Sequence, residues 1–162
     1  MKDRMMAGSN FSVENLGSRE VTDDDYTFLM ELFASTRSVE LAMFSNEEQK
    51  RAFVSMQFSA LMRCYPKAHS TIILYGQVPI GRTIIDRNSE ELRLVDISLL
   101  PEYRNRGIGA FLVRQLLDES RESKIPVRLH VFKYGDAVRF YERLGFQLLE
   151  DDGSYLKMEF QS

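Results

Sequence analysis

The sequence lacks the residues and segments that mark several common protein classes. It has one cysteine and two histidines, His69 and His130, among 162 residues. A single cysteine excludes an internal disulfide, and the histidines have no cysteine partners in a zinc-binding spacing. No apolar run approaches the roughly 20 residues that cross a bilayer, and no apolar stretch follows the charged N-terminus as in a secretory signal. We therefore expect no metal, no membrane partner and a cytoplasmic location.

The sequence also lacks an excess of charge. Its net charge is -3 with an isoelectric point near 5.5, which gives no reason to expect a nucleic-acid partner. Hydrophobic residues make up 44% and charged residues 28%, as in ordinary soluble globular proteins. The length suits one domain with a sizeable core. We expect a flexible tail at 1–9 and a single domain at 10–162.

Helical and strand patterns alternate along the chain, which predicts a mixed α/β fold. Apolar residues recur at helical spacing after Thr22 and after Ser45, and Ser45 with Glu48 forms a capping-box pattern. Cys64 lies in the second of these helices and is expected to be buried. Further helices are predicted over 107–123 and 136–144. Strands are predicted at 11–19, 70–75, 78–86, 91–100, 127–132, 146–149 and 155–160.

The most informative stretch is the loop between the strand at 91–100 and the helix at 107–123. Gly107 and Gly109 let an anion approach the backbone closely, and Arg104 and Arg106 add positive charge. A helix N-terminus also presents N–H groups without intrahelical partners and about half a positive charge. The loop therefore predicts a site for a doubly charged anion, most naturally a pyrophosphate.

Two better-known phosphate motifs do not fit this loop. The P-loop pattern Gly-x-x-x-x-Gly-Lys-Ser/Thr does not occur in the sequence. A Rossmann fingerprint would need a third glycine where the chain has Leu112. Two other interpretations stay open at this point: a mononucleotide site, and glycines that only allow a sharp turn from strand to helix.

Two motifs resemble those of the GNAT superfamily of N-acyltransferases. Arg104-x-x-Gly107-x-Gly109 is similar to its Arg/Gln-x-x-Gly-x-Gly/Ala motif. Downstream, the segment 137–146 is similar to its Ala-x-x-hydrophobic-Tyr-x-x-x-Gly-Phe junction. The order and spacing of both motifs agree with the superfamily, and the resemblance covers roughly residues 10–160. It implies a mostly antiparallel, twisted sheet flanked by helices, and an N-acetyltransferase that uses acetyl-CoA.

The resemblance also implies roles for individual residues. The backbone of the 104–109 loop would hold the CoA pyrophosphate, and the end of the preceding strand would hydrogen-bond the pantetheine arm. Tyr141 resembles the common general acid of the superfamily, because a phenol with a pKa near 10 can give a proton to the departing thiolate. Many relatives carry an asparagine just before the second motif, where this chain has Tyr134. The implied CoA-binding residues are Ser98, Leu99, Leu100, Arg104, Asn105, Arg106, Gly107, Ile108, Gly109, Ala110, Tyr134 and Phe140.

The base that takes the proton of the attacking amine is left open. Asp96 lies in an otherwise apolar strand just before the loop, and His130 lies on the next strand. In this fold the two strands would be neighbours, and an unperturbed histidine has a suitable pKa near 6.5. Either side chain, or a water relay, is a candidate base.

The acceptor amine is also left open. The resemblance implies an acceptor site formed by the first two helices and their loop, here 37–48 and 65–69. Glu40 and Glu47 are candidates to attract a cationic amine. Small molecules, antibiotics and proteins all remain possible acceptors, and the last two strands are candidates to pair two copies into a homodimer. The alternative function is a non-catalytic, CoA-binding regulatory module, against which Tyr141 argues.

Overall fold

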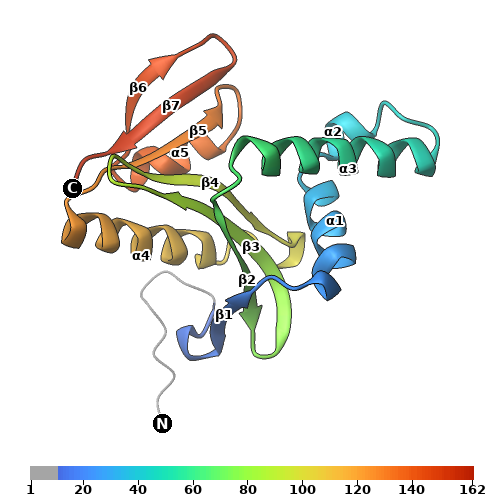
Figure 1. Ribbon diagram of the computed structural model, residues 1–162, viewed down its shortest axis with the longest axis horizontal. Coiled ribbons are helices and arrows are strands. Elements are labelled where there is room, and N and C mark those ends of the chain that lie inside the picture. The colour runs from blue at the N-terminus through green and yellow to red at the C-terminus, as the bar shows by residue number, and fades with distance from the viewer. Residues whose placement is uncertain (1–10) are drawn as a thin grey trace.

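Residues 11–162 are described in a computed structural model, and the predicted tail at 1–9 lies outside them. They form a seven-stranded sheet in the order β1-β2-β3-β4-β5-β7-β6, with helices on both faces (Figure 1). The strands are β1 (Leu16–Glu20), β2 (His69–Tyr75), β3 (Val78–Arg87), β4 (Leu92–Leu99), β5 (Val127–Phe132), β6 (Gln147–Asp151) and β7 (Tyr155–Phe160). The predicted α/β class and mostly antiparallel sheet are confirmed.

Five helices accompany the sheet in the described part of the chain. They are α1 (Tyr26–Ser35), α2 (Ser38–Leu41), α3 (Glu47–Cys64), α4 (Ile108–Ser123) and α5 (Ala137–Arg143). Helix α1 contacts β3, β4 and α3, whereas α4 contacts β4 and β5 (Figure 1). Short 3-10 turns occupy Val13–Asn15, Asp23–Asp25 and Pro101–Tyr103. The predicted element order holds, with the four-residue α2 as an addition that no periodicity in the sequence marks.

The sheet opens between its two central strands. Strands β4 and β5 are its one parallel pair, joined by α4, and their register covers only Leu92 with Val127 and Arg93 with Arg128. Strand β4 continues to Leu99, where its other side still pairs with β3 at Gly81. One backbone edge of β4 beyond Arg93 is therefore left without β5 as a partner, and it faces the space between the two strands.

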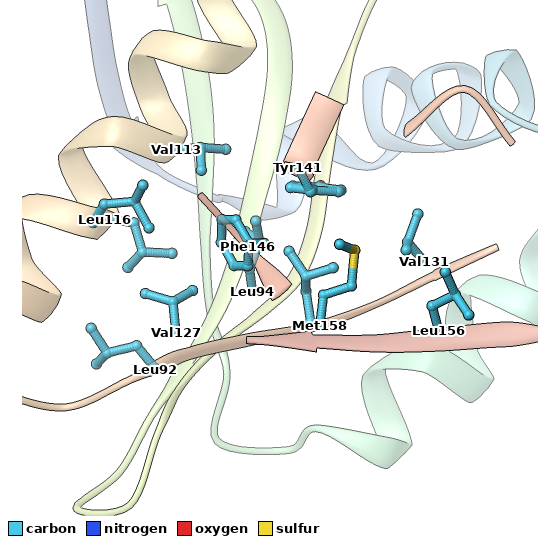
Figure 2. Close-up of a cluster of buried hydrophobic side chains, with 12 residues drawn as sticks. Leu92, Leu94, Val113, Leu116, Val127, Val131, Tyr141, Phe146, Leu156 and Met158 are labelled. Atoms are coloured by element: carbon cyan, nitrogen blue, oxygen red, sulfur yellow. The ribbon is translucent and has the colours of Figure 1, made fainter. Parts of the chain in front are cut away.

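The main core lies between the sheet and the helices α4 and α5. Figure 2 shows side chains from β4, β5, β7, α4 and α5 converging on one another, with Tyr141 and Phe146 among them. Burial of this apolar surface supplies most of the driving force for folding, at about 25 cal/mol per Å². Its buried members are Leu92, Leu94, Val113, Leu116, Leu117, Val127, Leu129, Val131, Tyr141, Phe146, Leu156 and Met158. The core thus holds α5, and with it Tyr141, against the open part of the sheet.

Three details of the predicted elements are wrong. The first strand begins at Leu16 because residues 13–15 form a 3-10 turn. Asn46, not Ser45, caps α3, because the Asn46 side chain accepts a hydrogen bond from the N–H of Glu48 at 2.7 Å. Cys64 is exposed. It lies ten residues after the buried Val54, so at 100° per residue it points about 80° away from the apolar face of α3.

Candidate functional site

A groove of about 600 Å³ lies where the open edge of β4 meets the loop before α4 and the start of α5. It brings together most of the residues that the sequence predicts for CoA binding, and Tyr141 with them. Its lining residues are Thr36, Ile97, Ser98, Leu99, Arg104, Asn105, Gly107, Gly109, Ala110, Asp136, Ala137, Phe140, Tyr141 and Arg143. The groove is therefore the candidate active site.

The start of α4 forms one wall of the groove. Gly107 is the N-cap residue and has a φ of 90°, a left-handed conformation that favours glycine. Among the described residues, no side chain caps this helix, so its first N–H groups are left for another partner. A methyl group at Gly109 would meet nothing nearer than Phe140 Cζ at 3.8 Å. The wall thus offers free donors and an open approach, as a phosphate group requires.

The two arginines of the loop have different surroundings. The Arg104 guanidinium donates to the Leu99 carbonyl at 2.8 Å and to the Ser35 hydroxyl at 3.0 Å. Arg106 points elsewhere, 5.4 Å from the ring of Tyr103 and 5.8 Å from that of Tyr75. Arg104 therefore fastens the loop to β4 and α1, and Arg106 does not line the groove.

The open edge of β4 forms the floor of the groove. The N–H of Leu100 donates to the carbonyl of Ile80 at 2.8 Å, so even-numbered residues at this end of the strand bond toward β3. Because backbone groups alternate in an antiparallel pair, Ile97 and Leu99 direct theirs to the opposite edge. The groups of Ile97 and the N–H of Leu99 offer strand-like hydrogen bonds to an extended ligand. The Leu99 carbonyl already accepts from Arg104, and Leu100 bonds away from the groove.

Tyr141 reaches the groove from the core. Its ring packs edge-on against Phe140 and Phe146, with centroids 5.0 and 5.4 Å apart, and its side chain is largely buried. Burial, with a smaller effect from the charge of Asp96, raises the pKa of Tyr141 above its usual value. The phenol is therefore protonated throughout the neutral range and is available as a donor.

Asp96 is held in place by a buried ion pair. Its Oδ2 accepts from Arg82 Nη2 at 2.9 Å and from Ser98 Oγ at 3.0 Å. Arg82 is fully buried beside the ring of Phe58, and its Nη1 has no hydrogen-bond partner among the described residues. The carboxylate of Asp96 is 22% exposed, and through Ser98 it adjoins the groove.

The other candidate base, His130, lies outside the groove lining. Strands β4 and β5 are neighbours as predicted, but His130 is exposed and its Nδ1 accepts from Arg93 Nη1 at 3.0 Å. Burial first, then the charges of Arg93 and Lys157, lower the pKa of His130. The imidazole is therefore neutral at physiological pH, with Nδ1 already engaged.

Two further predicted residues also lie away from the groove. Tyr134 is 75% exposed and packs against Phe132, with ring centroids 5.8 Å apart. Ile108 is buried in a second core cluster beneath α4. Ile108 therefore contributes its backbone at the helix start and no side chain.

The predicted site residues leave out five members of the lining: Thr36, Ile97, Asp136, Ala137 and Arg143. Ala137 and Arg143 lie within the second motif, where the resemblance implies roles only for Phe140 and Tyr141. Ile97 follows from the alternation of β4 once the sheet register is known. Asp136, Ala137 and Arg143 bracket Tyr141 on α5. Thr36 comes from the distant end of α1, and nothing local in the sequence signals its approach.

Two absences hold within residues 11–162. No helix there is long and apolar enough to cross a membrane. No three side chains among His, Cys, Asp and Glu come close enough together to hold a metal ion.

Comparison with known proteins gives one family and many similar folds. The sequence model of the acetyltransferase (GNAT) family matches residues 29–146. The comparison with curated proteins finds no match. PaiA N-acetyltransferase from Thermoplasma acidophilum, solved with coenzyme A, has a TM-score of 0.71 at 20% identity, covering 91% of this chain and 99% of its own.

Two other solved structures are similar. The ribosomal-protein-S18-alanine N-acetyltransferase from Escherichia coli has a TM-score of 0.64 at 17% identity, over 90% of this chain and 93% of its own. An acetyl-CoA-bound acetyltransferase from Elizabethkingia anophelis has a TM-score of 0.63 at 12% identity, over 92% and 99%. At these identities the likeness shows a shared fold.

Proposed function

The chain belongs to the acetyltransferase (GNAT) family, and on that basis we propose that it transfers an acetyl group from acetyl-CoA to a primary amine. One observation carries the proposal: the uncapped start of α4, the open edge of β4 and the phenol of Tyr141 line a single groove. Solved structures of this fold contain coenzyme A or acetyl-CoA. Acetyl-CoA supplies the acetyl group as a thioester.

The start of α4 is proposed to hold the pyrophosphate of CoA. The residues fit this role because the helix begins at Gly107 without a side-chain cap and Gly109 leaves the approach open. Arg104 keeps the loop in place from below through Leu99 and Ser35. The positive end of the helix then stabilises the bound anion.

The open edge of β4 is proposed to bind the pantetheine arm. The backbone groups of Ile97 and the N–H of Leu99 face the groove, and the arm carries amides that can pair with them as a further strand would. This pairing would direct the thioester toward the buried end of the groove, where Phe140 and Tyr141 lie.

Tyr141 is proposed as the proton donor. When the amine nitrogen bonds to the thioester carbon, the carbon–sulfur bond breaks and the sulfur leaves with its electron pair. The Tyr141 hydroxyl donates a hydrogen bond, and then its proton, to that sulfur. The raised pKa keeps the phenol protonated beforehand, and it makes the hydrogen bond to the developing thiolate the larger part of the effect.

The amine must lose a proton during the attack, and Asp96 is better placed than His130 to assist. Asp96 adjoins the groove through Ser98, whereas the Nδ1 atom of His130 bonds to Arg93. Because Arg82 and Ser98 fix the position of the carboxylate, Asp96 is suited to orient the incoming amine. A water molecule beside it can then accept the proton.

The test is acetyl transfer by the purified protein across a panel of primary amines, with wild type and Tyr141→Phe compared. We expect the variant to lower kcat by about 100-fold, a usual size for a lost general acid, with little change in the KM for acetyl-CoA. Tyr26→Phe, an exposed position on α1, is the matched control. An unchanged kcat in Tyr141→Phe would remove the proton-donor assignment.

A cytoplasmic location and pairing of two copies through the last strands stay predictions.

A further inference from the structure

One cation near the groove, Arg37, forms no ion pair in the described part of the chain. Arg37 follows Thr36, which lines the groove, and it precedes α2. Its guanidinium lies 3.6 Å above the ring centroid of Phe33 and donates from Nε to Gln57 Oε1 at 2.7 Å and from Nη1 to Thr36 Oγ1 at 2.6 Å. Both acceptors are neutral, and no ion pair within residues 11–162 involves Arg37.

This arrangement fixes the guanidinium while leaving donors free. An arginine has five N–H donors in a planar fork, of which Arg37 uses two. The N–H groups of Nη2 are left, and stacking on Phe33 limits the rotation of the fork. A half-buried cation without an anion costs free energy unless a ligand supplies one. Burial accordingly lowers the pKa of Arg37.

The neighbours of Arg37 place it on the acceptor side of the groove. The charged or titratable groups that act on it are Asp96, Glu40, Arg82 and Tyr155, none of which belongs to the loop before α4. Arg82 pairs with one oxygen of Asp96, and Arg104 is engaged by Ser35 and Leu99. Arg37 and Arg82 both lie against the ring of Phe33, 3.6 and 5.7 Å from its centroid, and Arg82 pairs with Asp96. The free fork of Arg37 therefore lies on the Asp96 side of the groove.

We propose that the acceptor is a primary amine that also carries a carboxylate, and that Arg37 is the residue that selects it. This inference rests on the proposed function. The ammonium or amine group lies toward Asp96 and the carboxylate toward the Arg37 fork, so the pair of protein charges matches a zwitterion such as a free amino acid. A planar guanidinium binds a carboxylate through two parallel hydrogen bonds, which makes the selection geometric as well as electrostatic.

The experiment compares kcat/KM for free amino acids and for the corresponding amino-acid amides, expressed per concentration of unprotonated amine. The two members of each pair differ only in the anionic group. We expect wild type to prefer the acids by about 10- to 100-fold, the range of one charge-assisted contact. Arg37→Gln should abolish this preference while leaving the amides and the KM for acetyl-CoA unchanged. Arg63→Gln, which removes an exposed charge near the end of α3, is the matched control and should retain the preference.

The outcomes distinguish failure of this inference from failure of the proposed function. Equal kcat/KM for acids and amides in wild type, or an Arg37→Gln variant that lowers both alike, overturns the inference and leaves acetyl transfer intact. Dipeptides with an acidic or a neutral first residue form a second arm. If kcat/KM is higher only for the dipeptides with an acidic first residue, and Arg37→Gln removes that difference, the carboxylate that Arg37 binds belongs to a peptide side chain. No acetyl transfer to any amine by folded protein overturns the proposed function itself.

Discussion

The Arg104 guanidinium bonds to Ser35 at the end of α1, although 69 positions separate the two residues in the chain. Its Nη2 lies 3.0 Å from the Ser35 hydroxyl and 3.4 Å from the Ser35 carbonyl, while its Nε donates to Leu99. The contact joins the loop before α4 to the helix whose end leads into the proposed acceptor site. The arginine of the phosphate-loop motif thus stabilises the wall of the groove by hydrogen bonds to α1 and β4.

Replacing Arg104 should weaken acetyl-CoA binding through the loop. In Arg104→Lys the charge stays, but a point-like ammonium cannot make the forked contacts to Ser35 and Leu99. Two lost hydrogen bonds of about 1 kcal/mol each predict a roughly tenfold or larger rise in the KM for acetyl-CoA. Steady-state kinetics measure it, with Arg114→Lys on the exposed face of α4 as the control. Equal KM values in both variants would contradict the role given to the Arg104 contacts.

Gly81 should tolerate no side chain. A Cβ there would collide with the backbone oxygen of Ser98 and lie 2.7 Å from Leu99 Cδ2. Gly81→Ala therefore forces β3 and β4 apart, and we expect a loss of about 1–3 kcal/mol in the free energy of unfolding. Acetyl-CoA affinity should fall with it, because the displaced residues form the floor of the groove.

The matched control for Gly81 is Gly17 in the edge strand β1, on the other side of β2. Its Cβ would meet nothing closer than Leu74 Cβ at 4.0 Å, so Gly17→Ala should change stability by no more than about 0.5 kcal/mol. Chemical denaturation of both variants gives the comparison. Similar losses in the two would mean that the close approach at Gly81 does not determine stability.

Asp25 should contribute stability that depends on pH. Two hydrogen bonds of 2.7 Å from Arg19, then a backbone bond from Thr22, hold the pKa of the buried Asp25 far below its usual range. Because the folded-state pKa is depressed, the contribution is complete above the unfolded value of about 4 and is lost as pH falls toward the folded one. Asp25→Asn should melt at a lower temperature than wild type at pH 7, and the gap should narrow below about pH 4. If the difference in melting temperature stays constant across that pH range, Asp25 does not contribute pH-dependent stability.

Tyr141 should not ionise with the other tyrosines. The chain has seven tyrosines, and burial raises the pKa of this one. An alkaline titration followed by tyrosinate absorbance should show the same amplitude near pH 10 in wild type and in Tyr141→Phe. The raised pKa also means that stability falls above pH 10, where the unfolded chain loses this proton and the folded one keeps it. A smaller amplitude in the variant would show that the phenol is accessible.

The sequence predicts well those parts of the site that are formed by consecutive residues. Gly107, Gly109 and Tyr141 belong to short motifs whose spacing survives in any fold of this family, and all three line the groove. The strand before the loop was also predicted, since alternation and a following proline mark its end. These features depend on local geometry, which the sequence carries directly.

The sequence could not predict what depends on packing between distant segments. Arg104 carries a charge that suits a phosphate, yet its partner Ser35 belongs to another helix. Tyr134 stands where relatives have a polar residue, and only the path of the chain after β5 shows that its ring faces solvent. Nothing in the sequence distinguishes Arg37 from other arginines, because its contacts with Phe33 and Gln57 arise only from the packing of α1 against α3.

The most direct test of the account is calorimetric titration of wild type and Gly107→Ala with acetyl-CoA, with ATP as the reference ligand. Gly107 begins α4 with a φ of 90°, so an alanine there is strained and displaces the N–H groups that would hold the anion. Gly109→Ala is the matched control, because a methyl group has room there and the family motif admits alanine at that position. We predict saturable, micromolar binding of acetyl-CoA to wild type and to Gly109→Ala, much weaker binding of ATP, and a clear loss of acetyl-CoA affinity in Gly107→Ala. Folded wild-type protein that does not bind acetyl-CoA, or that binds ATP equally well, would contradict the assignment of the groove.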